Sequence, residues 1–182
     1  VVIPSGTEVT VISNAQCDTL TLQPEAILVL NQADTLTASL ITIESRADTT
    51  LTGIVFNHGY MDIAHGIRIE SHISRNRWVP LSTGIYNATT QTYNAQNEEF
   101  YWWNPADSEF TQITDNSTPL NPLHGYLYRN QSADTLLNQQ GEINQGAQST
   151  DLIVNQADSL YKGWNIVGNP YNAPLNWHST GW

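Results

Sequence analysis

The sequence is poor in cysteine, in lysine and in charge altogether. Cys17 is the only cysteine among 182 residues, so no disulfide can form within the chain. Charged residues make up 13% of the sequence, about half of the usual share. Seventeen acidic residues against six basic ones give a net charge of −11, which repels nucleic acid and anionic membrane surfaces. We therefore expect no nucleic-acid partner.

Long hydrophobic runs and helical periods are also missing. A membrane-spanning helix needs a run of about 18 apolar residues, and because none occurs we expect no membrane insertion. No stretch repeats its apolar residues with the period of an amphipathic helix. The sequence starts at Val1 without Met or a signal peptide and ends at Trp182, so we expect a processed product or a fragment.

The abundant residues favour β structure. Hydrophobic residues make up 40% of the chain, which is enough for a packed core, and Thr and Asn suit exposed strand faces and turns. Pro, Gly, Asn and Asp recur every ~8–12 residues, which is typical of all-β sandwiches and barrels. The sequence therefore predicts an all-β fold. Predicted strands of the second half are Arg77–Ser82, Glu99–Trp103, Gly125–Arg129, Asp151–Val154 and Gly163–Val167.

Two regions differ in composition, and we place their boundary after residue 74. Residues 1–74 contain only Phe56 and Tyr60 as aromatic residues, whereas all six Trp follow. In this first region Asp-Thr recurs at 18, 34 and 48, and each copy precedes a short apolar run. Such recurrence predicts a solenoid-like stack of β-units, with a meander of hairpins as the alternative. We expect residues 75–182 to form a Trp- and Tyr-rich, β-sandwich-like module.

Residues suited to catalysis or metal binding form no recognisable arrangement. There is no Gly-X-Ser-X-Gly motif, and Cys17 is expected to be a small buried hydrophobe. Glu98 and Glu99 are neighbours that point to opposite faces of a strand, unlike the facing carboxylates of a glycosidase. A spacing of seven residues, which matches no metal motif, separates three histidines: His58, His65 and His72. We expect no enzyme, no metal and no cofactor.

A distinctive motif lies near the C-terminus, where residues 163–171 read GWNIVGNPY and residues 174–177 read PLNW. With NRWVPLS at 76–82, FYWWN at 100–104 and LHGYLYRN at 123–130, it resembles a module of secreted surface proteins of Bacteroidetes-type bacteria, which the type IX secretion system exports. The stretch IPSGTEVTV at 3–11 is similar to the β-repeat that often precedes this module. The resemblance implies an extracellular or cell-surface location. From the residues themselves, we expect Trp164, Ile166 and Val167 to form a buried strand.

Five tripeptides share one form, in which Asp precedes a hydroxyl residue and then an apolar residue or Thr. They resemble the O-glycosylation signal of the same bacterial group, which implies sugars on Thr19, Thr35, Thr49, Thr135 and Ser159. The alternative is structural, because Asp accepts a main-chain N–H at turns and Thr then opens the next strand. The two copies outside the first region favour modification.

Aromatic residues supply the candidate contact surface. We expect exposed rings at Tyr101, Trp102, Trp103, Tyr126 and Tyr128, ready to contact a glycan or a partner protein. Trp102 and Trp103 face opposite sides of a strand, so at most one belongs to the core. We therefore expect a non-catalytic structural or adhesive module of a bacterial surface protein, as a glycosylated subunit of a surface fibre. Its partners would be other copies of itself or other surface proteins, joined through β-edges. The alternative is a carbohydrate-binding module of a secreted protein, with polysaccharide as its ligand.

Overall fold

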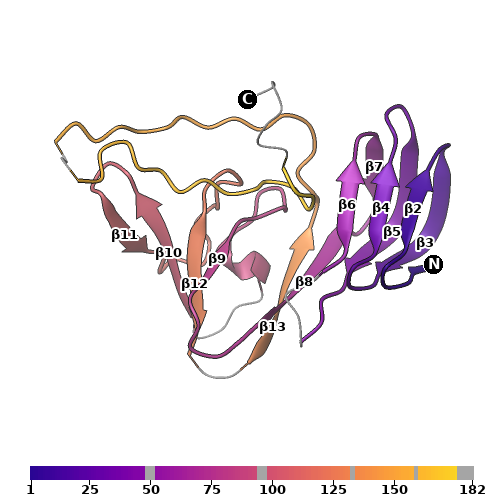
Figure 1. Cartoon of the computed structure of the whole chain (residues 1–182), viewed down its shortest axis with the longest axis horizontal. Helices are drawn as coiled ribbons and strands as arrows, with labels where there is room; N and C mark the ends of the chain where they lie inside the picture. The colour runs from indigo at the N-terminus through magenta and orange to yellow at the C-terminus, as the bar shows by residue number, and fades with distance from the viewer. Residues whose placement is uncertain (48–51, 94–97, 132–133, 158–159, 176–182) are drawn as a thin grey trace.

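A computed structural model describes the chain except for residues 48–51, 94–97, 132–133, 158–159 and 176–182. The fold is all-β, as the sequence predicts, with one short 3-10 helix, η1 (Thr90–Tyr93). Among the described residues, no helix has the length and apolar character required to cross a bilayer. A stack of coils and a four-stranded sheet lie at opposite ends of the molecule (Figure 1).

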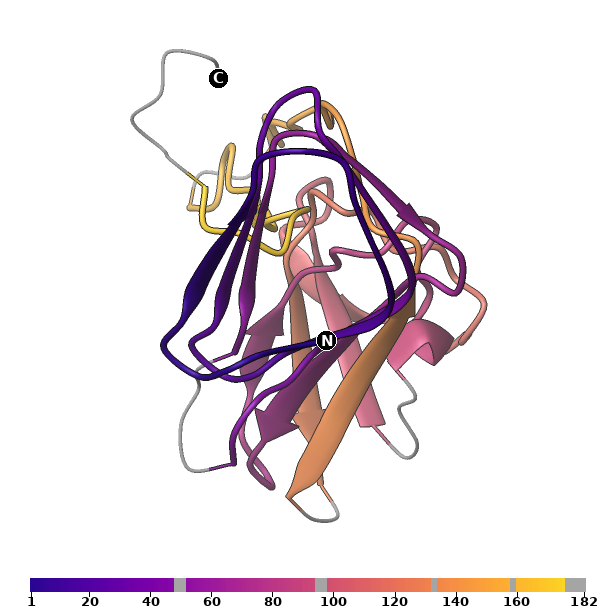
Figure 2. The same cartoon turned by 90° about the vertical axis from the view of Figure 1, so that its right-hand side faces the viewer.

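The first region is a parallel β-solenoid, seen end-on in Figure 2 as coils with a roughly triangular outline. All pairings between its described strands are parallel, and they build two stacks, β1-β3-β5-β8 with β7 on β5, and β2-β4-β6. These strands are β1 (Val2–Ile3), β2 (Glu8–Val11), β3 (Ala15–Leu22), β4 (Ile27–Leu30), β5 (Thr35–Ile43), β6 (Ile54–Asn57), β7 (Tyr60–Ile63) and β8 (Ile67–Ile73). The solenoid interpretation therefore holds over the hairpin alternative.

Columns of aliphatic side chains hold the coils together. The register aligns Ile3 with Leu22, Leu22 with Ile43 and Ile43 with Ile69, and all four are buried. These aligned positions are 19, 21 and 26 residues apart, whereas the Asp-Thr copies are 16 and 14 apart. The prediction that the Asp-Thr spacing marks the repeating unit is wrong. The repeating unit is one coil, and each coil adds one residue to the aliphatic column.

The second region contains a four-stranded antiparallel sheet in the order β11-β10-β12-β9. Its strands are β9 (Val79–Leu81), β10 (Glu98–Asn104), β11 (Glu109–Gln112) and β12 (Tyr126–Asn130). The last strand, β13 (Thr135–Gly141), instead pairs antiparallel with β8 of the solenoid. The predicted boundary after residue 74 follows the end of β8, but one continuous sheet joins the two regions across it.

The core of the second region lies on the inner face of the four-stranded sheet, where aromatic rings pack edge to face. Phe100 lies 5.3 Å from Tyr93 and 5.2 Å from Tyr128, measured between ring centroids. Tyr93 comes from η1, which packs against β13. η1 therefore lies between the inner face of the four-stranded sheet and β13.

A long segment, residues 142–175, crosses the top of the second region and contains no strand among its described residues. We call it the strap. The amide of Asn144 anchors it by donating to the carbonyl oxygens of Thr83 (3.1 Å) and Pro170 (3.0 Å). The strands predicted at Asp151–Val154 and Gly163–Val167 are absent, because the described part of this segment forms no ladder with a neighbouring strand. It is held instead by single contacts, such as the isolated bridge from Val167 to His124. The buried strand predicted around Trp164 is likewise wrong, since Trp164 is 60% exposed.

A candidate binding face

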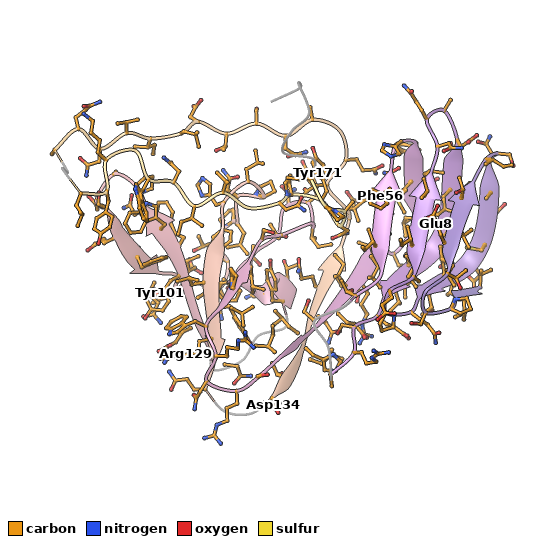
Figure 3. The ribbon with its side chains drawn as sticks, in the orientation of Figure 1. Glu8, Phe56, Tyr101, Arg129, Asp134 and Tyr171 are labelled. Carbon is orange, nitrogen blue, oxygen red and sulfur yellow. The ribbon has the colours of Figure 1, made fainter. Side chains whose placement is uncertain are left out.

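The outer face of the four-stranded sheet carries a set of aromatic side chains. Strand alternation places Tyr101 and Trp103 of β10 on the same face, opposite Gln112 and Phe110 of β11 in the antiparallel register. Figure 3 shows Tyr101 and Arg129 on the side of this sheet that points away from the solenoid. Of the five rings expected to be exposed, Tyr101 and Trp103 lie on this face, and both are half-buried.

Four rings form a continuous aromatic cluster at one end of this face. Trp103 contacts Phe110 at 5.3 Å and Tyr161 at 5.7 Å, and Tyr161 contacts Trp164 at 5.5 Å, all close to perpendicular. The indole Nε1 of Trp103 also donates to the carbonyl oxygen of Trp164 at 2.9 Å. Phe110, Tyr161 and Trp164 remain 42%, 38% and 60% exposed. The cluster thus presents apolar rings to solvent on a fixed framework.

The other end of the face combines aromatic rings with one neutralised charge pair. Trp78 contacts Tyr101 edge to face at 5.6 Å, and the guanidinium of Arg129 lies 4.6 Å from the centre of the Trp78 ring. Arg129 forms an ion pair with Glu99. Gln131 donates to the other oxygen of Glu99 at 2.8 Å. Because the charges of Arg129 and Glu99 cancel, this end of the face offers aromatic rings for stacking without a strong electrostatic field.

Three of the predicted contact residues lie on the inner face of the sheet and not on the outer face: Trp102, Tyr126 and Tyr128. Trp102 packs against the core and lies parallel to His124, with ring centroids 5.9 Å apart. Tyr126 and Tyr128 are only 4% and 0% exposed, so the prediction that they offer rings to a ligand is wrong. They pair with Trp102 and Phe100 across the sheet, which directs all these side chains inward.

Burial shifts the pKa values of two groups on the inner side of the sheet, Tyr126 and His124. Burial raises the pKa of Tyr126 to about 12, although hydrogen bonding to Asn121 opposes this shift. Its hydroxyl accepts from the Asn121 N–H at 2.7 Å and donates to the Asn121 carbonyl at 3.2 Å. Burial lowers the pKa of His124, which favours the neutral imidazole beside Trp102. These groups are neutral packing elements at pH 7 and carry no charge to a ligand.

Sequence reasoning missed four members of the face: Trp78, Phe110, Tyr161 and Trp164. Strand alternation predicts that Tyr101 and Trp103 share one face of the sheet. It does not predict that the strap adds two further rings to that face. Tyr161 and Trp164 lie some sixty positions along the chain from Trp103, and no local pattern relates them. A usable signal was the excess of aromatic residues after residue 77.

The predicted modification sites differ in their surroundings. Thr19 is exposed on β3, while Thr35 and Thr135 are half-buried at the first positions of β5 and β13. The carboxylate of Asp134 accepts the N–H of Arg75 at 2.8 Å, which fits the structural reading of that tripeptide. Thr49 and Ser159 lie outside the described residues. Exposure therefore favours Thr19 among the three described candidates.

Two histidines of the solenoid, His65 and His72, are paired with serines. Nδ1 of His65 lies 3.1 Å from Oγ of Ser39, and Nδ1 of His72 lies 2.7 Å from Oγ of Ser45. Across the part of the chain that the structure describes, no three His, Cys, Asp or Glu side chains gather as metal ligands would. Cys17 is half-buried on β3 and packs against the core.

A cavity of about 490 Å³ lies where the solenoid meets the strap. Phe56, Ile143 and Tyr171 supply apolar walls, and Asn57 and Gln145 supply amides. The side chain of Gln145 accepts from Asn57 and Met61 and donates to the Met61 carbonyl, each at 3.2 Å. The described residues that line the cavity include no carboxylate.

These features define the class as a parallel β-solenoid joined through one sheet to an antiparallel module with an aromatic outer face. The chain belongs to a family described as a domain of unknown function, DUF8693, whose family model matches residues 1–180. No curated protein and no solved structure gives a significant match.

Proposed function

We propose that this protein is a non-catalytic structural and adhesive module of a bacterial surface protein, located outside the cell. The single observation that carries the proposal is the aromatic face of the four-stranded sheet. Exposed aromatic side chains held on a rigid sheet are the groups that dominate binding energy at protein contacts. The solenoid provides a stiff scaffold behind this face, because its coils are fastened by buried aliphatic columns.

The charge distribution supports contact by stacking and hydrogen bonding. Arg129 and Glu99 neutralise one another on the face, and the net charge of −11 disfavours an anionic partner. The sequence resemblance supports export by the type IX system and O-glycosylation of the Asp-Thr sites. Sugars on exposed positions such as Thr19 would solubilise a surface that is short of charge.

A carbohydrate-binding module is the second candidate, and the aromatic cluster favours it. Trp164, with 60% of its surface exposed, offers an indole ring on which a pyranose ring can stack. Neutral hydrogen-bonding groups lie beside the rings, such as the amide of Gln112 opposite Tyr101. This combination fits a neutral polysaccharide better than a charged one.

Binding to insoluble polysaccharides and to bacterial cells, measured side by side, tests both candidates. In Trp164→Ala the ring is lost while the main-chain carbonyl that accepts from Trp103 is retained. Tyr60→Ala is the matched control, because Tyr60 is also 60% exposed but belongs to the solenoid strand β7. Loss of polysaccharide binding only in Trp164→Ala supports the carbohydrate module, and loss of cell binding alone supports adhesion to a protein.

Wild-type protein that binds neither material would contradict both candidates. Equal binding by wild type and Trp164→Ala would remove the aromatic face as the site. Intact-mass measurement of protein from its native source tests the glycosylation separately, and a mass equal to the bare polypeptide would refute it.

A further inference from the structure

The cavity of about 490 Å³ lies between strand β6, in the last coil of the solenoid, and the strap. Figure 3 shows Phe56 on β6 and Tyr171 on the strap near one another at this junction. Sites for small ligands commonly have volumes of about 300–1,000 Å³, with apolar walls and a few polar groups that fix orientation. The cavity has this size and this character, because aromatic, aliphatic and amide side chains line it.

The strap meets the edge of β6 that faces away from β4 at two places. The N–H of Val55 donates to the carbonyl oxygen of Asn172 at 3.4 Å. Beyond the end of the strand, the N–H of Met61 donates to Oε1 of Gln145 at 3.2 Å. Because main-chain groups alternate in direction along a strand, the N–H and carbonyl of Asn57 point to the same edge as those of Val55. They lie between the two contacts, and no described residue bonds to the Asn57 N–H.

The side chain of Asn57 is a polar group at the end of a second apolar column. The register aligns Val11, Leu30 and Asn57, and Leu30 is fully buried. The amide nitrogen of Asn57 donates to Oε1 of Gln145 at 3.2 Å, but its Oδ1 is buried and has no hydrogen-bond partner among the described residues. A buried polar atom without a partner costs about 1–3 kcal/mol. A ligand that brings a donor to this wall of the cavity would remove that cost.

The free part of this edge fits one amide group and not a whole strand. Asn57 offers one N–H and one carbonyl, which is the complement of a single secondary amide in a sheet. A peptide that extends a sheet pairs over several residues in line, and the contacts of Asn172 and Gln145 occupy the edge on both sides. The rings of Phe56 and Tyr171 offer flat apolar surfaces. The described lining residues include no Asp, Glu, Lys or Arg, so the fitting ligand is uncharged.

We propose that this cavity is a second binding site and that it takes the acetamido group of an uncharged N-acetylated sugar. The N–H and carbonyl of the acetamido group pair with the main-chain carbonyl and N–H of Asn57, as a neighbouring strand would. The acetyl methyl group contacts the aliphatic wall, which includes Ile143 and Leu175, and the sugar ring packs on Tyr171. The aromatic face lies on the side of the four-stranded sheet that points away from the solenoid, so this site does not depend on the proposed function.

Titration calorimetry of the whole chain with two disaccharides tests the inference. N,N′-diacetylchitobiose and cellobiose have the same linkage and differ in the acetamido groups. Wild-type protein is expected to bind the acetylated sugar at least about tenfold more tightly, because cellobiose leaves the Asn57 edge unpaired. Ala147→Trp places a large ring in the cavity from an exposed position of the strap, and is expected to weaken binding of the acetylated sugar at least about tenfold. Trp164→Ala alters only the aromatic face and is expected to bind this sugar like wild type.

Amide NMR spectra of the wild-type chain provide a measurement that needs no variant. Addition of N,N′-diacetylchitobiose is expected to shift the N–H signal of Asn57, and shifts confined to β10, β11 and the turn at Trp164 would overturn the inference. Equal affinity for the two disaccharides, or no binding of either, would also overturn it. Binding that is lost in Trp164→Ala and kept in Ala147→Trp would place the sugar on the aromatic face. That result would support the carbohydrate-binding candidate and refute the cavity site, so the two proposals fail separately.

Discussion

The indole N–H of Trp103 donates to the carbonyl oxygen of Trp164 at 2.9 Å, across 61 residues of sequence. This bond joins the middle strand β10 to the strap and fixes the ring of Trp164 at the edge of the aromatic face. Lys162, the sole lysine of the chain, lies in the exposed turn between Tyr161 and Trp164. The integrity of this contact can therefore be followed by cleavage after Lys162.

Trp103→Phe should loosen the strap while it keeps a ring in the cluster. Loss of one hydrogen bond is expected to cost about 1 kcal/mol in the free energy of unfolding, measured by urea denaturation. Cleavage by trypsin after Lys162 should become faster, because the turn leaves its position more often. Unchanged cleavage would mean that the strap is held in place without this bond.

Leu22→Ala should destabilise the solenoid strongly. Leu22 is fully buried between Ile3 and Ile43 in the aliphatic column, and truncation of such a side chain costs about 2–5 kcal/mol. Thr21→Ala changes the adjacent position, whose side chain points outward, and is expected to stay within about 0.5 kcal/mol of wild type. Denaturant unfolding of both variants tests the assignment of inward and outward faces, and equal losses would contradict it.

Gly66→Ala should be more damaging than Gly146→Ala. Both glycines have positive φ, 73° and 70°, and an L-residue in that conformation costs about 1–2 kcal/mol. A Cβ on Gly66 would lie 2.2 Å from the carbonyl oxygen of Gly141, whereas a Cβ on Gly146 meets nothing within 4 Å. The clash should add about 1–3 kcal/mol. Similar thermal unfolding midpoints for the two variants would contradict this prediction. They would mean that the main chain at the junction of β8 and β13 shifts to accommodate the added Cβ at little cost in free energy.

Stability should fall as the pH drops below the ordinary pKa of histidine, in part because of His124. Burial lowers the pKa of His124 in the folded protein below the usual 6.5, so the unfolded chain binds the proton more readily. The stabilisation is complete above pH 6.5 and declines as the pH falls toward the lowered pKa of the folded state. His124→Gln should flatten this part of the curve of unfolding free energy against pH, and an unaltered slope would exclude the contribution.

Local patterns predict individual strands well wherever a partner strand exists. The predicted strands Arg77–Ser82, Glu99–Trp103 and Gly125–Arg129 overlap β9, β10 and β12. The predicted strand Gly163–Val167 has the same apolar character but lies in the strap. Apolar alternation indicates that a segment is extended and contacts an apolar surface. It does not indicate whether another strand pairs with that segment.

The candidate site was predictable only in part, for a related reason. Alternation predicts that Trp102 and Trp103 face opposite sides, and the register of β10 confirms it. It does not state which side is the core, so Tyr126 and Tyr128 were expected outside and lie inside. The two sides differ in what packs on them: Tyr93 of η1 contacts Phe100 on the inner face, and η1 in turn packs against β13.

The sequence by itself determined the all-β class and the lack of a disulfide within the chain, because these follow from composition, strand periodicity and a single cysteine. Only the tertiary structure decided the true length of the coil, the sheet shared by β8 and β13, and the meeting of Trp103 with Trp164. Periodicity fixes which way neighbouring side chains point along one strand. Which strands and loops then meet depends on the burial of surfaces that lie far apart in the chain, and that information is not local.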